Sequence, residues 1–275
     1  MPTPRDIREK ALLSLFAHTA HKGASLDDHT WELALEPEQA TINKLALKAL
    51  KHQLPALPQR AQEFHDLIQV IAPMMKTYEL DKEARTALSL RKEVSALALS
   101  YSALGKLSKL DEIDAFYLKG LTLRPKLLAF TTSLDGSSFT APELSKLQKV
   151  TKTLTDLTQR IDHIASPLEY PDQRSIAALS KASQEQVALR AEAQRYTDGV
   201  IKHIERIDEA LSTHLHHYTQ DQIGRVELNL LRLAAYELMI LELPKGIVIN
   251  ENLELARKFS TEDAIPLLNG VLDNL

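Results

Sequence analysis

Apolar residues in the middle of the chain recur at alternating intervals of three and four positions. This spacing places them on one side of a helix, where they form the narrow apolar seam that packs in antiparallel bundles. Three such runs occupy residues 64–78, 87–104 and 147–164. Because each run is too short for a fibrous coiled coil, the pattern predicts a helical bundle. The seam residues are Phe64, Leu67, Ile71, Met74 and Tyr78; Ala87, Leu90, Val94, Leu97, Tyr101 and Leu104; and Leu147, Val150, Leu154, Leu157, Ile161 and Ile164.

Two further helices are predicted before the first seam. One covers residues 6–21, where apolar residues again form a stripe, and it ends at Lys22-Gly23. The other covers residues 39–53 and ends before a proline-rich segment. Glycine, serine and proline predict loops at 131–142 and 166–175.

The last ninety or so residues predict four more helices. The pattern tightens from about residue 187, and Val200, Ile204, Ile207, Leu211 and Leu215 form one face of a long helix. The next helix, 221–241, is apolar nearly all round from Leu228 onward, which is typical of the centre of a bundle. A proline at 244 begins the third helix, and a serine at 260 with an aspartate at 263 predicts a capping box for the last.

Composition agrees with an all-α fold. The 275 residues include only 8 glycines and 5% aromatic residues, whereas sheets need more turn glycines and more β-branched or aromatic residues. The absence of cysteine excludes disulfides and thiolate zinc sites. No signal peptide or membrane-length apolar run is present, so we expect a cytoplasmic protein that does not bind membranes.

Charge and motifs limit the function. A net charge of -4 argues against a protein that coats nucleic acid, so any RNA contact should be confined to one face. No glycine-rich phosphate loop, zinc-protease motif or nucleophile elbow is found, and we expect neither an enzyme nor a cofactor. His214 and His217 could share a helical face, but a polar helix end explains them better than a metal site because no carboxylate lies at ligand spacing.

Several short motifs recur in fixed order near the C-terminus. They are GRVELNLLRLAAYEL at 224–238, INE at 249–251, ELARKF at 254–259, TED at 261–263 and NGVLD at 269–273. In this order the segment resembles the C-terminal half of the NusB family of transcription antitermination factors. Residues 5–16 resemble the family's first helix, on fewer positions.

The resemblance implies an all-α, NusB-like helical bundle made of two packed subdomains. Family members are typically about half as long as this chain, so we expect an enlarged, inserted helical region in the N-terminal part. The expected organisation is a first helix at 1–23, extra helices at 24–185, and a NusB-like C-terminal subdomain at 186–275. Asn269-Gly270 would be a close contact between helices.

The resemblance also implies a function. NusB factors bind a boxA-type element of the ribosomal RNA leader together with NusE, a small-subunit ribosomal protein, and join the RNA polymerase complex. The positions that match the family's arginine-rich start are Arg5, Arg8 and Lys10, and Lys245 follows the loop proline; these are the candidate RNA contacts. Glu242 matches the acidic residue that would contact the protein partner.

A second hypothesis is a structural module that keeps the NusB-like fold but has lost RNA binding. The acidic net charge favours this alternative, and so does the thin basic patch of the first helix, where acidic residues alternate with basic ones. Under it, the extra helices would supply a protein-binding or self-association surface, and a homodimer is a candidate under either hypothesis. An RNA-modifying enzyme is disfavoured, because no methyl-donor-binding segment is present.

Overall fold

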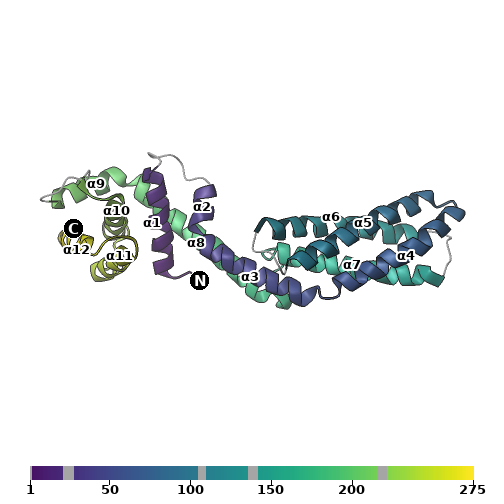
Figure 1. Cartoon of the computed structure of the whole chain (residues 1–275). Helices are drawn as coiled ribbons and strands as arrows, with labels where there is room; N and C mark the ends of the chain where they lie inside the picture. Colours follow the sequence, from purple (N-terminus) through teal and green to yellow (C-terminus); the bar gives the residue numbers. More distant parts are fainter. Residues whose placement is uncertain (1, 21–27, 105–109, 136–141, 216–221) are drawn as a thin grey trace. The chain divides into compact units, whose positions relative to one another are not determined.

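The computed structural model describes residues 2–20, 28–104, 110–135, 142–215 and 222–275, and regular structure within these ranges is entirely helical. The all-α prediction is therefore confirmed. The chain folds into two compact units (Figure 1). Unit 1 contains Met1–Ala40 with Gln184–Leu275, and unit 2 contains Thr41–Ser183.

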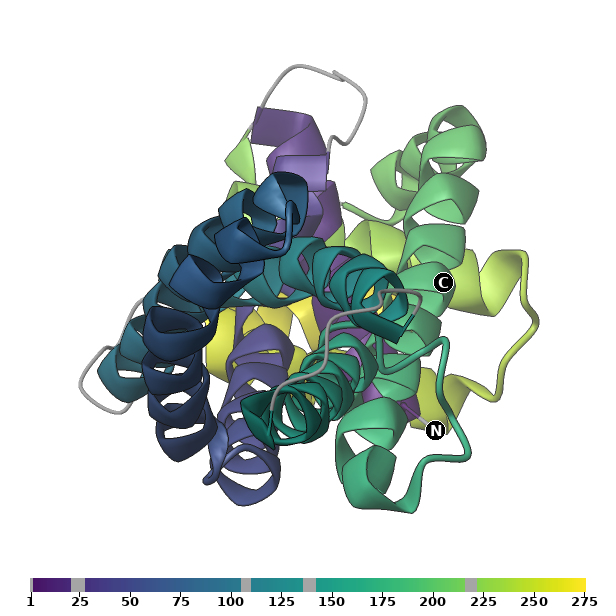
Figure 2. The ribbon, with the colours of Figure 1, turned by 90° about the vertical axis from the view of Figure 1, so that its right-hand side faces the viewer.

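Unit 2 is built on a four-helix bundle of α4 (Leu57–Thr77), α5 (Asp81–Ala103), α6 (Leu110–Asp135) and α7 (Pro142–Ala165). Consecutive helices pack together, and α4 also packs on α7, which closes the bundle. Figure 2 views these helices from one end. The three predicted seams form its core: every seam position is buried or packs against the core, except Tyr78 at the end of α4, which is 53% exposed.

Unit 1 surrounds α10 (Arg225–Met239), as the apolar sequence of that helix predicts. The helices α1 (Pro4–Ala20), α9 (Ile204–His214), α11 (Lys245–Phe259) and α12 (Ala264–Asn274) all pack against it. Burial on several sides therefore fixes α10, and α1 and α11 are positioned relative to each other through it.

Two longer helices, α3 (Glu36–Gln53) and α8 (Ala177–Lys202), each contribute residues to both units. Within unit 1, α8 packs against α2 (Asp28–Ala34), where Trp31 and Ala193 share a small core. The Arg190 guanidinium lies 5.9 Å from the centre of the Trp31 ring, in a cation–π contact. A short 3₁₀ turn, Arg174–Ile176, precedes α8.

Four local predictions are wrong. The long helix predicted from Val200 to Leu215 is broken at His203, where α8 ends and α9 begins. The loop predicted at 131 begins later, because α6 continues to Asp135; residues 136–141 lie outside the described ranges. Ser260 donates its hydroxyl to Glu227 instead of capping α12. Gly270 is not a close helix contact, since a Cβ there would meet no atom of the described residues within 4 Å.

Within the described ranges, no helix is long and apolar enough to cross a membrane. The same residues contain no group of three side chains that could hold a metal ion. His217, one of the two histidines considered for such a site, lies outside them.

Candidate nucleic-acid interface

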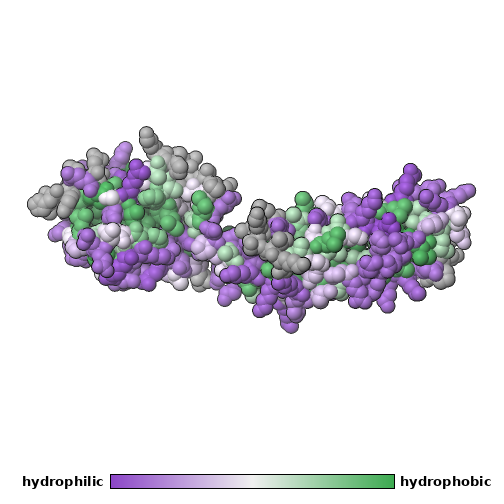
Figure 3. Space-filling view, in the orientation of Figure 1, coloured by the Kyte–Doolittle hydropathy of each residue, from purple (hydrophilic) through white to green (hydrophobic). Residues whose placement is uncertain are grey.

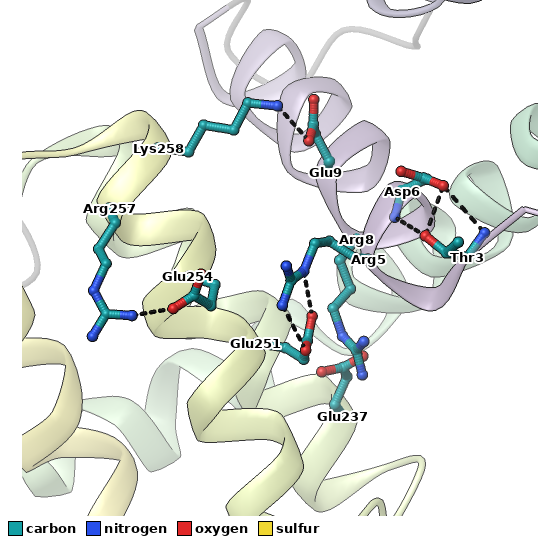
Figure 4. Close-up of polar contacts among 10 residues, drawn as sticks. All are labelled: Thr3, Arg5, Asp6, Arg8, Glu9, Glu237, Glu251, Glu254, Arg257 and Lys258. Carbon is teal, nitrogen blue, oxygen red and sulfur yellow. Dashed lines mark hydrogen bonds and ion pairs between the residues drawn. The ribbon is translucent and has the colours of Figure 1, made fainter.

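A capping box formed by Thr3 and Asp6, which was not predicted from the sequence, fixes the N-terminus of α1. The backbone N–H and the hydroxyl of Thr3 both donate to the Asp6 carboxylate, at 3.2 and 2.7 Å, and the Asp6 N–H donates back to the Thr3 hydroxyl at 3.2 Å (Figure 4). Pro4 occupies the first helical position, where its missing N–H costs nothing. The direction in which α1 presents its basic residues is therefore well defined.

Arg8 points into unit 1 and not toward solvent. Its Nε donates to Glu237 Oε1 on α10 at 2.8 Å, and the two side chains are only 6% and 2% exposed. Burial raises the pKa of the Glu237 carboxyl, although Arg8 and a hydrogen bond from Tyr196 oppose that rise. The pair therefore attaches α1 to α10, and Arg8 could reach an RNA only by leaving a carboxylate buried without its partner.

Arg5 lies on a different side of α1, facing α11. Its Nε and Nη2 donate to the two carboxylate oxygens of Glu251 at 2.9 and 3.0 Å, a bidentate arrangement that is drawn in Figure 4. The Arg5 side chain is 52% exposed. Its hydrogen bond holds the pKa of Glu251 below the ordinary carboxyl value.

A second contact joins the same two helices one turn further along α1. Lys258 Nζ on α11 donates to Glu9 at 2.7 Å, with the lysine 56% exposed. Arg257 on α11 pairs with Glu254 of its own helix. We call Arg5, Arg257 and Lys258 the α1–α11 basic set: all three are more than half exposed, and each already contacts a carboxylate (Figure 4).

The remaining candidates lie in different environments. Lys10 is only 5% exposed and pairs with Glu38 at 3.0 Å. Lys245 is exposed at the start of α11, where its Nζ donates to the Asp273 carbonyl at 2.8 Å near the end of α12. Thus Arg5 and Lys245 are accessible, whereas Arg8 and Lys10 are buried in ion pairs.

Glu242 occupies an unusual backbone conformation in the loop between α10 and α11. Its φ is 53°, in the left-handed region, where glycine is preferred. The Leu243 N–H beyond it returns to the Glu237 carbonyl at 3.0 Å, and the Leu241 N–H bonds the Tyr236 carbonyl. Glu242 therefore lies two positions after Ile240, the C-cap of α10, in the turn that follows the helix. Its side chain is exposed.

Two members of the basic set, Arg257 and Lys258, were missed by sequence reasoning, as was the role of Glu251. The sequence does place these two cations in the last turn of α11, directly after its last buried residues, Leu255 and Ala256. Their proximity to α1 had no such signal, since Glu251 is 246 residues from Arg5.

Unit 2 carries a surface cavity of about 450 Å³ between α4 and α7. Its lining combines basic side chains (Arg60, Lys146, Lys149) with acidic ones (Glu63, Asp66). Because the charges alternate in sign, this cavity does not form the basic track that a nucleic-acid backbone requires.

These elements define an all-α protein whose unit 1 packs around one central helix, α10. A sequence model of the NusB family matches residues 148–275, from α7 to the C-terminus. The transcription antitermination protein NusB of Geobacter sp. strain M21 is 30% identical over 146 residues, which cover 53% of this chain and 94% of the relative. NusB of Campylobacter hominis is 39% identical over 95 residues, covering 33% of this chain and 72% of the relative. No solved structure matches the chain.

The chain therefore belongs to the NusB family. The relatives are named as transcription antitermination proteins. The family match excludes α1, so the interpretation of that helix depends on its contacts with α10 and α11.

Proposed function

We propose that this protein is a non-enzymatic, RNA-binding transcription antitermination factor of the NusB type. In this proposal it binds a boxA-like element of the ribosomal RNA leader together with NusE, and joins the RNA polymerase complex. The observation that carries the proposal is its likeness to a NusB antitermination protein across 94% of that relative's length.

We place the RNA contact on the exposed cations of unit 1: Arg5 and its neighbours Arg257 and Lys258, with Lys245 as a further contact. A half-exposed guanidinium can grip a phosphate or stack on an unpaired base without losing a buried partner. Arg8 and Lys10 contribute indirectly in this scheme, since their buried pairs with Glu237 and Glu38 hold α1 in place. Glu242 is the proposed contact for NusE.

The alternative, a NusB-like interaction module without RNA binding, is supported by the pairing of the basic set. An RNA phosphate would have to compete with Glu251 for Arg5 and with Glu9 for Lys258. In the alternative these ion pairs only join α1 to α11. The two functions therefore differ in what happens when a carboxylate partner is removed.

Fluorescence anisotropy of a labelled boxA-like RNA, with and without the host's NusE and at two salt concentrations, tests the proposal. We expect binding that weakens with salt and tightens with NusE. Arg5→Ala should weaken binding about tenfold and reduce the salt slope by about one phosphate contact. Lys92→Ala, which removes an exposed cation from unit 2, is the matched control and should leave binding unchanged.

Glu251→Gln supplies the opposite change at the same site. It removes the negative charge that competes for Arg5 but keeps a side chain of similar size, so we expect RNA to bind several-fold more tightly. If the full-length protein binds no RNA with or without NusE at low salt, the RNA-binding proposal is wrong and the interaction-module alternative replaces it.

A further inference from the structure

The surface cavity between α4 and α7 has two walls of different charge. The α4 wall contributes the carboxylates of Glu63 and Asp66, and the α7 wall contributes the ammonium groups of Lys146 and Lys149. Its volume of about 450 Å³ falls in the range typical of small-molecule sites. All of its lining belongs to unit 2, and we call it the α4–α7 cavity.

The carboxylates of the α4 wall already have partners on their own helix. Glu63 accepts from the Arg60 guanidinium and from the Gln59 side chain. One oxygen of Asp66 accepts from the Gln62 side chain at 2.8 Å, and the other accepts from none of the described residues. The α4 wall is therefore close to neutral at the Arg60–Glu63 pair and keeps one free acceptor at Asp66.

The two lysines of the α7 wall have no such partners. Lys146 and Lys149 are both exposed, and within the described part of the chain neither ammonium group pairs with a carboxylate. They are three positions apart on one helix, so they lie on the same face with their Cβ atoms about 5–6 Å apart. Two unpaired cations at this spacing match a group with two negative charges, such as a phosphate monoester at neutral pH.

The least exposed side chains that line the cavity are apolar. Val150 is only 8% exposed, and Leu67 packs against the core of the bundle. Figure 3 shows apolar surface among the hydrophilic residues of unit 2. Thr153 donates its hydroxyl to the Lys149 carbonyl at 2.9 Å, and its oxygen can still accept. An inorganic phosphate would leave the apolar part of the lining without a contact, so the matching ligand also has an organic part.

We propose that the α4–α7 cavity binds a small phosphomonoester whose organic part has an apolar face and hydrogen-bond donors at its edge. Lys146 and Lys149 hold the phosphate, while Leu67 and Val150 contact the apolar face. The free oxygen of Asp66 accepts from an amino or hydroxyl group of the ligand. A nucleoside monophosphate has all of these features. Because the site lies within unit 2, it is separate from the RNA contact proposed for unit 1 and goes beyond it.

Calorimetric titration of the full-length protein with adenosine monophosphate is the first test. Since the anchoring cations are exposed, we expect a dissociation constant on the order of 0.1 mM that rises with salt. Lys146→Ala combined with Lys149→Ala should raise it by about tenfold or more, because both charges that hold the phosphate are lost. Lys152→Ala is the matched control, since it removes an exposed lysine of α7 that does not line the cavity.

Two partial ligands test which parts of the ligand are recognised. Adenosine lacks the phosphate and inorganic phosphate lacks the organic part, so each should bind at least about tenfold more weakly than adenosine monophosphate. Equal affinity for adenosine would remove the lysines as the anchor, and equal affinity for inorganic phosphate would show an adventitious ion only. Absence of saturable binding of adenosine monophosphate up to about 10 mM, or full affinity in the double lysine variant, would overturn the proposal.

RNA anisotropy separates this site from the RNA interface. The double lysine variant should bind boxA-like RNA as the native protein does, because the proposed RNA contacts lie in unit 1. Weaker RNA binding by this variant would show that the two lysines contact RNA, and would overturn a separate ligand site. If the native protein binds no RNA, the RNA proposal fails, whereas the titration with adenosine monophosphate still decides this one.

Discussion

At the scale of single residues, the ion pair between Arg8 and Glu237 is the contact with the largest expected effect on stability. Both side chains are almost completely buried, and the pair joins α1 to α10. Replacing one partner leaves a charge buried without compensation, which typically costs about 3–5 kcal/mol. We expect Arg8→Met to lower the free energy of unfolding by this amount in urea denaturation at neutral pH.

The loss should depend on pH in a defined direction. Burial already raises the pKa of Glu237, and Arg8→Met removes the interactions with Arg8 that oppose the rise. The folded variant then binds the proton more readily than the unfolded chain, so its stability is greatest below the unfolded pKa and falls as pH rises through the raised folded pKa. The difference between variant and native protein should therefore shrink on acidification. The double variant Arg8→Met/Glu237→Met is the control, and it should recover most of the loss. A pH-independent difference would contradict this account.

Glu242 is a residue whose conformation is costly and whose side chain is exposed. A non-glycine residue in the left-handed region loses about 1 kcal/mol, which glycine avoids at the expense of its own conformational entropy. We expect Glu242→Gly to raise the free energy of unfolding by about 0.5–1 kcal/mol in urea denaturation. In our proposal the same change weakens NusE binding, which calorimetric titration measures.

Glu242→Gln separates these two effects, because it retains the strained backbone but removes the charge. It should leave stability near the native value and weaken NusE binding as Glu242→Gly does. Retained NusE affinity in both variants would remove Glu242 from the proposed interface and leave its conformation as a feature of the loop alone.

At the scale of helices, Gly199 of α8 permits a close approach to α10. A Cβ at this position would collide with the hydroxyl and ring of Tyr236. That ring cannot move freely, since it is 7% exposed and its centre lies 6.0 Å from the ring of Tyr196 and 6.4 Å from the ring of His203. We expect Gly199→Ala to destabilise the protein by about 1–3 kcal/mol, as over-packing does.

Gly270→Ala is the matched control for that change. Gly270 also lies within a helix, α12, but a Cβ there would meet none of the described atoms within 4 Å. Alanine should then stabilise the helix by about 0.5–1 kcal/mol, the ordinary difference in helix propensity. Urea denaturation of both variants measures the contrast, and equal effects at the two positions would show that the contact with Tyr236 is unimportant.

The helices were largely predictable because burial of one side of a helix leaves a period in the sequence. The seam of α7 shows this best: all six of its predicted positions are buried. The break at His203 was not predictable in this way, because Val200, Ile204 and Ile207 continue the period across it. The break is visible only in the backbone hydrogen bonds, because the His203 N–H bonds the carbonyls of both Gly199 and Val200.

The candidate site was less predictable than the fold, for a physical reason. A local pattern reveals a positive charge but not its partner, and the partners here are distant in sequence. Arg8 meets a carboxylate 229 positions away, and this contact decides that it is buried while Arg5 is half exposed. The two arginines are three residues apart, and from the sequence alone they were equivalent candidates.

At the scale of the whole molecule, unit 2 is one continuous segment, Thr41–Ser183, whose ends both connect to unit 1. Within unit 1, the Gln186 side chain on α8 donates to Gln39 on α3 at 3.0 Å. The segment between Ala40 and Gln184 therefore leaves unit 1 and returns at neighbouring points. Such a geometry allows a short linker to close the chain, at a small entropic cost.

This arrangement predicts that unit 1 folds without unit 2. We expect a protein in which a short Gly-Ser linker replaces residues 41–183 to unfold cooperatively in urea, monitored by circular dichroism, because α10 keeps its contacts with α1, α9, α11 and α12. It should bind boxA-like RNA within about twofold of the full-length affinity if the exposed cations of unit 1 make the contact. A shortened protein that folds but has lost RNA binding would move the RNA contact into unit 2.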